Sequence, residues 1–299
     1  MFRFILMVGI VAFIPLPSIA ALSIFACEPE WAALAREVGG DLVGATSATT
    51  AMQDPHHIQA RPSLIARMRK ADLAICTGAG LETAWLPLLL RRANNPRVQP
   101  GQPGYLEAAA AVSLLDRPQR LDRAEGDIHA QGNPHIQMNP HNMAAVAKVL
   151  AQRLSTIDPG NAPQYQINLD DFLSRWESAI DRWEKAALPL KGMTMVVEHR
   201  SWVYLSQWLG MVRVATIEPK PGVPPGSSDL ARLVAQMEQQ PADMIVRAAY
   251  QNDRGAKWLS ARTGIVDVEL PFTVGGSDKA QDLFGLFDDT LHRLLKGVP

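Results

Sequence analysis

The pattern of apolar and polar positions predicts one long amphipathic helix near the middle of the chain, between residues 158 and 188. Its apolar side chains recur in steps of three and four, at Tyr165, Leu169, Phe172, Trp176, Ile180, Trp183 and Ala187. This spacing places them on one helix face. Asp158 and Pro159 are typical of a helix start, and Pro189 and Gly192 of its end. Such a helix spans roughly 40 Å, which favours a rod joining two halves over an ordinary core helix.

Short apolar runs alternate with amphipathic segments on both sides of this helix. Expected strands before it lie at 22–27, 41–46, 72–77 and 112–114, and expected helices at 30–38, 62–70, 80–92 and 142–154. Expected strands after it lie at 193–197, 212–217, 244–246 and 266–270, and expected helices at 201–209, 229–239, 255–263 and 279–295. Alternation of this kind predicts parallel sheets with helices on both faces. We expect two similar α/β domains, 22–157 and 189–299, joined by a linking helix, 158–188, with a ligand site in the cleft between them.

The first 21 residues have the character of a secretory signal peptide. Arg3 supplies a positive charge, residues 4–14 are almost wholly apolar, and cleavage is expected near Ala20/Ala21. The apolar run is too short to span a bilayer, which disfavours a retained membrane anchor. A lipoprotein with Cys27 as the lipidated residue is a weaker alternative, because Phe25 stands where lipidation needs a small residue. We therefore expect an exported protein.

The two cysteines, Cys27 and Cys76, each end an apolar run that reads as a buried strand. Neighbouring parallel strands would bring these ends together. Since an exported protein meets an oxidising compartment, we expect a disulfide between them, the alternative being two buried free thiols.

Composition and motifs exclude several classes of function. The chain has 299 residues and a formal net charge of −1, so no broad basic field is available for nucleic acid. Residues 78–83 (GAGLET) almost fit the dinucleotide-binding motif, but Thr83 replaces the third glycine and no suitable acidic residue follows. The sequence contains neither GxSxG nor HExxH, which disfavours a serine hydrolase and a zincin protease.

Histidines follow the expected strands and loops at positions suited to a metal site. His56 and His57 follow the second strand in a proline-fixed loop, while His129, His135 and His141 lie within thirteen residues of one another. A lone loop histidine is more often solvated than metal-bound. The clustering favours metal binding, but the pattern does not decide between His56 and His57 or between His135 and His141.

The second half contributes two further candidates, His199 and Asp278. His199 comes directly after a strand, where α/β folds place functional side chains, and Asp278 precedes the last helix as either a carboxylate ligand or a helix cap. Three histidines and one carboxylate suit Zn²⁺. Four protein ligands leave no open position for water, which argues against a hydrolytic site.

Several segments in order resemble the metal-binding receptors of bacterial ABC importers, the family of periplasmic zinc- and manganese-binding proteins. These segments are DPHHIQARPS, ADLAICTGAGLET, NPHIQMNP, VVEHRSWVYLSQWLG, IEPKPGVPP and GGSDKAQDLFGLFDDTL. Each match is weak alone, but their order and spacing cover nearly the whole mature chain. The resemblance implies a periplasmic, non-enzymatic receptor with two α/β domains and a rigid linking helix.

The resemblance also implies which residues bind the metal. It assigns one Zn²⁺ to His56, His135, His199 and Asp278, and leaves His57, His129 and His141 without a role. Histidine at 199 matches the zinc-type receptors, whereas manganese receptors carry glutamate there. The implied partner is an ABC permease of the inner membrane, with a periplasmic zinc chaperone as a further candidate, and we expect a monomer.

The chain departs from the family pattern in several places. Asn133 and Gln137 replace an acidic residue and a tryptophan, the histidine-rich loop is short, and Arg247 stands where an acidic residue is frequent. A manganese or iron receptor of the same family is the first alternative. A zinc enzyme with a metal-bound water, with Asp278 not bound to the metal, is another. A surface adhesin would need a lipid anchor at Cys27.

Overall fold

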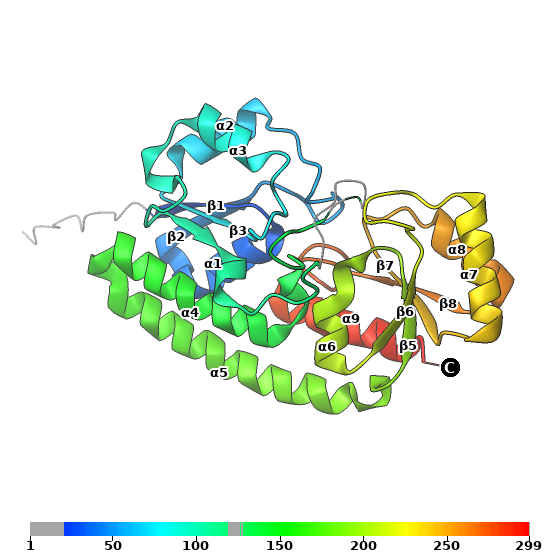
Figure 1. The fold of residues 1–299 in the computed structure, drawn as a ribbon. Coiled ribbons are helices and arrows are strands. Elements are labelled where there is room, and N and C mark those ends of the chain that lie inside the picture. The colour runs from blue at the N-terminus through cyan, green and yellow to red at the C-terminus, as the bar shows by residue number, and fades with distance from the viewer. Residues whose placement is uncertain (1–20, 119–125, 127, 299) are drawn as a thin grey trace, which may run out of the picture.

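The computed structural model describes residues 21–118, 126 and 128–298, which form two α/β domains lying side by side along one long helix (Figure 1). The predicted signal peptide, apart from Ala21, lies outside the described residues. Within the part described, no helix is both long and apolar enough to cross a membrane.

The first domain is built on a parallel sheet with the strand order β2-β1-β3-β4. Its strands are β1 (Leu22–Ala26), β2 (Val43–Ser47), β3 (Leu73–Cys76) and β4 (Tyr105–Glu107). The helices are α1 (Pro29–Gly39), α2 (Pro62–Lys70), α3 (Leu86–Ala93) and α4 (Pro140–Ile157). Alternate side chains of β1 face opposite layers: Ile24 packs in the cluster with α1 and α4, and Phe25 in the cluster with α2 and α3. This arrangement turns the carboxyl ends of β1 and β2 toward the second domain.

The second domain repeats this plan, with the strand order β6-β5-β7-β8. Its strands are β5 (Thr194–Val197), β6 (Val212–Thr216), β7 (Met244–Ala248) and β8 (Val266–Leu270). The helices are α6 (Val203–Leu209), α7 (Ser227–Gln239), α8 (Arg254–Thr263) and α9 (Leu283–Lys296). Helices α7 and α8 cover the face that carries Val196, and α6 and α9 cover the face that carries Val197. The predicted α/β class and the two similar domains are thus confirmed.

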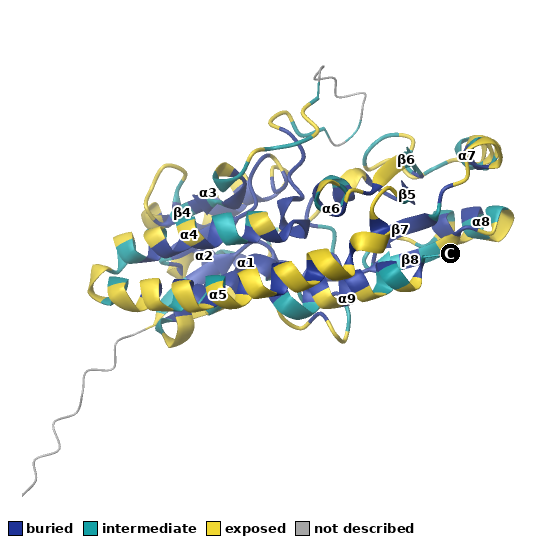
Figure 2. Ribbon diagram, turned by 90° about the horizontal axis from the view of Figure 1, so that it is seen from below, coloured by how far each residue is buried: buried dark blue, intermediate teal, exposed yellow. Residues whose placement is uncertain are grey.

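The predicted central helix is α5 (Ala162–Ala186), and it packs against both domains. Its apolar stripe is buried as expected, while its outer face is exposed along its length (Figure 2). Trp176 donates a hydrogen bond from Nε1 to the carbonyl of Pro140 in α4 at 2.8 Å. Trp183 donates from Nε1 to Asp288 in α9 at 2.6 Å. One hydrophobic core therefore runs beneath both domains and restricts their relative motion.

The expected disulfide is present between Cys27 and Cys76, whose Cα atoms lie 4.7 Å apart. Because β1 and β3 are paired neighbours, the residues at and just beyond their carboxyl ends meet. The sulfur of Cys27 is committed to this bond and its side chain is buried, which removes the basis for a lipid anchor there.

Several expected boundaries are wrong. The fourth strand is Tyr105–Glu107, whereas the expected segment 112–114 lies in a loop after a 3₁₀ turn. The helix expected from residue 80 begins only at Leu86, because a series of turns precedes it. Asp158 caps no backbone group of α5, and instead accepts hydrogen bonds from the side chains of Asn161 and Tyr165.

Candidate metal centre

His56 is held by a carboxylate from its own loop, after β2. Asp54 Oδ1 lies 2.7 Å from the ring Nδ1 of His56 and also accepts from its backbone N–H at 3.0 Å. Although burial acts to raise it, hydrogen bonding to His56 lowers the pKa of Asp54 below its ordinary value. The indole of Trp85 donates to the carbonyl of Pro55 at 2.9 Å and fixes the loop. An ionised Asp54 keeps the proton of His56 on Nδ1, which leaves Nε2 with a lone pair for a metal.

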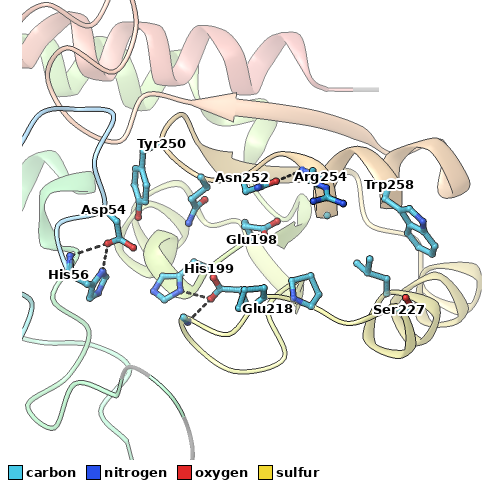
Figure 3. A pocket seen from close by; sticks show the side chains of 16 residues that line it. Asp54, His56, Glu198, His199, Glu218, Ser227, Tyr250, Asn252, Arg254 and Trp258 are labelled. Carbon is cyan, nitrogen blue, oxygen red and sulfur yellow. Dashed lines mark hydrogen bonds and ion pairs between the residues drawn. The ribbon is translucent and has the colours of Figure 1, made fainter. Parts of the chain in front are cut away.

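His199 is oriented in the same way from the other domain. It follows β5, and its Nδ1 lies 2.7 Å from Oε2 of Glu218, which follows β6 (Figure 3). Glu218 also accepts a hydrogen bond from the backbone of Gly222 at 2.9 Å. Both histidines thus have a carboxylate on one ring nitrogen, the arrangement that commonly orients metal-binding imidazoles.

His135 lies beside both of these rings and is the most deeply buried of the group, at 1% exposed. Its ring centroid lies 5.3 Å from that of His56 and 5.7 Å from that of His199. Neither of its ring nitrogens has a hydrogen-bond partner among the described residues. Burial, reinforced by the neighbouring histidines, holds its pKa well below the usual value. Burying a neutral imidazole whose nitrogens have no hydrogen-bond partner raises the free energy of the folded state, and a metal ion bound to one nitrogen would remove much of that penalty.

His129, which the sequence pattern includes in the histidine cluster but to which the family resemblance gives no role, joins this group. Its Nε2 lies 3.2 Å from Nε2 of His56, and one ring nitrogen from each of His56, His129 and His135 lies within 4.8 Å of the other two. Burial, followed by the neighbouring His56 and His199, lowers the pKa of His129 to about 4. Gly80 adopts a φ of +90°, a conformation that favours glycine, and it packs against this ring, since an added Cβ would lie 3.4 Å from Nδ1 of His129. The glycine turn of the near-dinucleotide motif therefore lies beside the histidine cluster.

The remaining candidates lie elsewhere. His141 is on α4 and pairs through Nε2 with Glu184 of α5 at 2.9 Å, away from the cluster. The side chain of His57 is exposed beside His56. Asp278 is exposed in the turns before α9, and neither it nor His199 is in the group whose ligand atoms all lie within 4.8 Å of one another. His199 adjoins that group, however, because its ring centroid lies 5.7 Å from those of His56 and His135. The structure therefore brings together His56, His129, His135 and His199.

One residue that departs from the family pattern, Asn133, links this centre to the second domain. Asn133 accepts from the backbone of His135 at 3.0 Å, and its amide donates to the carbonyl of Arg200 in the other domain at 2.7 Å. The hydroxyl of Tyr204 donates to the carbonyl of Asn133 at 2.7 Å. Arg247 instead belongs to the sheet, where it pairs with Asp267 at 3.1 Å and with Glu269 on the adjacent strand.

Comparison with known proteins places this geometry in a family. Residues 24–297 match the family model described as ZnuA, zinc-uptake complex component A, periplasmic. The chain is 23% identical over 286 residues to the manganese ABC transporter substrate-binding lipoprotein PsaA of Streptococcus mitis, covering 93% of this chain and 89% of that protein. It is 24% identical over 277 residues to a metal ABC transporter substrate-binding lipoprotein of Lactococcus lactis, covering 89% and 84%.

Solved structures show the same fold. A crystal structure of ZnuA superposes with a TM-score of 0.75 and 22% identity, covering 91% of this chain and 99% of that one. The solute-binding protein FpvC of Pseudomonas aeruginosa, in complex with Mn²⁺, superposes with a TM-score of 0.79 and 18% identity, covering 93% and 98%.

Proposed function

Because this chain belongs to the family of periplasmic zinc-uptake components, we propose that it captures Zn²⁺ outside the cytoplasm and delivers it to an ABC-type import permease. The family and its relatives are substrate-binding proteins of metal ABC transporters, so the chain belongs to that class and is not an enzyme. The observation that carries metal capture is His135, whose two buried ring nitrogens lack any partner among the described residues while three further imidazoles surround it.

The chemistry of the cluster favours zinc. Imidazole nitrogen suits Zn²⁺, whereas Mn²⁺ prefers oxygen ligands. The nearby carboxylates of Asp54 and Glu218 each make a hydrogen bond with Nδ1 of a histidine, so in this arrangement they orient the imidazoles and do not serve as oxygen ligands. The alternative is a manganese or iron receptor, which the manganese-named relatives favour.

We propose His56, His135 and His199 as ligands, as the family resemblance implies, with His129 as the fourth. Asp278 remains the alternative fourth ligand, and would require the exposed turns before α9 to move toward the cleft. Four nitrogen ligands match the tetrahedral preference of Zn²⁺.

The remaining parts of the proposal concern transport. The chain would be exported by a signal peptide over residues 1–21 and act in the periplasm as a monomer. Its domains would be residues 22–157 and 189–299, with 158–188 as the linking helix. An inner-membrane permease would open the cleft and release the ion, and a periplasmic zinc chaperone is a candidate donor.

A metal competition experiment tests the proposal. The mature chain from Ala21 is stripped of metal, offered equal zinc and manganese, and analysed by mass spectrometry for bound metal. We expect a single zinc ion per chain in the wild type and in His141→Ala, and sharply weakened binding in His135→Ala and His199→Ala. Preferential manganese binding would favour the alternative, and the absence of any bound metal would refute the receptor.

A further inference from the structure

A pocket of about 630 Å³ adjoins the histidine cluster on the side of the second domain. It begins at His56 and His199 and extends past Glu198 to Arg254 and Trp258 of α8 (Figure 3). A bare metal ion needs only the space between the imidazoles, so this volume exceeds what the ion requires. Pockets of this size commonly hold small organic molecules.

Glu198 gives this pocket an unsatisfied polar group. Its side chain lines the pocket, the residue is only 7% exposed, and Oε2 has no hydrogen-bond partner among the described residues. Gly255 packs against this side chain, since an added Cβ there would lie 3.5 Å from that same oxygen and 2.9 Å from Cγ2 of Ile217. A buried carboxyl oxygen with free space beside it is a recognition point for a hydrogen-bond donor, such as an amine.

The outer end of the pocket has the opposite character. Arg254 is the first residue of α8, and its guanidinium makes no ion pair within the described part of the chain. The helix N-terminus adds partial positive charge at this end. Trp258 provides an aromatic wall and is itself held by Arg262, whose guanidinium carbon lies 3.5 Å from the ring centroid. This end suits a carboxylate on a small organic body.

We propose that this pocket binds an amino acid such as histidine that accompanies the metal, with its ammonium group on Glu198, its carboxylate at Arg254 and its side-chain donor facing the ion. The inference rests on the proposed metal function and specifies the form in which the cargo is taken. The four imidazoles already fill the tetrahedral positions of a zinc ion, so the amino acid would lie beside the ion as its companion and would not replace a protein ligand.

Equilibrium dialysis with radiolabelled L-histidine tests this inference. The mature protein is loaded with zinc, and bound histidine and bound zinc are counted together. We expect the wild type to retain histidine with zinc, and Glu198→Gln and Arg254→Ala each to weaken histidine binding by about tenfold or more, since each loses a charge-assisted contact. The zinc content should stay the same in both variants.

Lys257→Ala is the matched control, because it removes a positive charge from the exposed face of α8 outside the pocket. Histidine binding in this variant should equal that of the wild type. Zinc-loaded protein that retains no histidine would overturn the inference and leave the proposed function intact, as would equal retention by all variants. Protein that binds no zinc would instead refute the proposed function, and this inference with it.

Discussion

The fourth metal ligand can be decided by exchanging two side chains separately for alanine, at His129 and at Asp278. In the structure, one ring nitrogen of His129 lies within 4.8 Å of ring nitrogens of His56 and His135, close enough for all three to bind one ion. Asp278 is exposed and outside that group. We therefore expect His129→Ala to weaken zinc binding strongly and Asp278→Ala to leave it unchanged.

The size of the effect follows from sharing the binding free energy among the ligands. Tetrahedral zinc sites bind with about 10–16 kcal/mol at neutral pH, so an average ligand of four contributes about 2.5–4 kcal/mol. Removing one should weaken the affinity by about 10² to 10³-fold. The pKa of His129 is lowered to about 4, so its ring is already neutral at neutral pH and no proton must leave before it binds.

Competition with a chromophoric chelator at neutral pH measures these affinities. Wild type, His129→Ala, Asp278→Ala and His141→Ala are compared, the last being a control for loss of a histidine outside the cluster. Circular dichroism of the metal-free variants establishes that each is folded. The reasoning is refuted if Asp278→Ala loses about 10²-fold while His129→Ala matches the wild type.

Three further outcomes follow from the structure. Glu218→Gln should weaken zinc binding by about tenfold or more, because it removes the charge that orients His199; the same competition assay checks this, and an unchanged affinity would contradict it. Burial raises the pKa of Glu30 to about 7, so the folded protein keeps this carboxyl protonated at about pH 5 and is destabilised by its buried charge at about pH 8. Glu30→Gln removes this ionisation and should therefore raise the free energy of unfolding by about 1–3 kcal/mol more at about pH 8 than at about pH 5 in urea titrations. Equal effects at the two pH values would contradict this. Thr273→Val removes the hydroxyl that donates to Glu30 across the domain boundary, and should lower the unfolding free energy by about 1–2 kcal/mol in the same titrations.

Much of the fold could be predicted because its strands and long helix carry strong patterns. The strand Leu73–Cys76 is buried at every position, and the stripe of α5 is continuous. The strand Tyr105–Glu107 has a single buried residue, Leu106, so its pattern is too weak to recognise. Helix α3 begins later than expected because Gly78 and Gly80 adopt positive φ angles in the turns that precede it.

The candidate site was less accessible to sequence reasoning. The family resemblance, which the comparisons confirm, implies His56, His135, His199 and Asp278 as ligands, and the three histidines lie together while Asp278 is exposed apart from them. The sequence indicates His129 only as one of three nearby histidines, because its place in the cluster depends on packing against Gly80, which is distant in the sequence. The role of Glu218 was not predicted. Its place after β6 parallels that of Asp54 in the loop after β2, so the repeated plan of the two domains could have indicated a carboxylate that orients His199.

The two domains contribute unequal numbers of imidazoles to the cluster, and in the proposed site this would set the order in which the ligands bind the ion. The first domain contributes His56, His129 and His135, whereas the second contributes only His199. In the proposed site, even a small movement of the second domain away from the first would therefore remove one imidazole from a bound ion and leave three in place. Binding would then begin on the first domain and be completed when His199 reaches the ion. A permease that moves only the second domain would convert a slowly exchanging site into one with three ligands, in which one coordination position of the ion is open to the next acceptor.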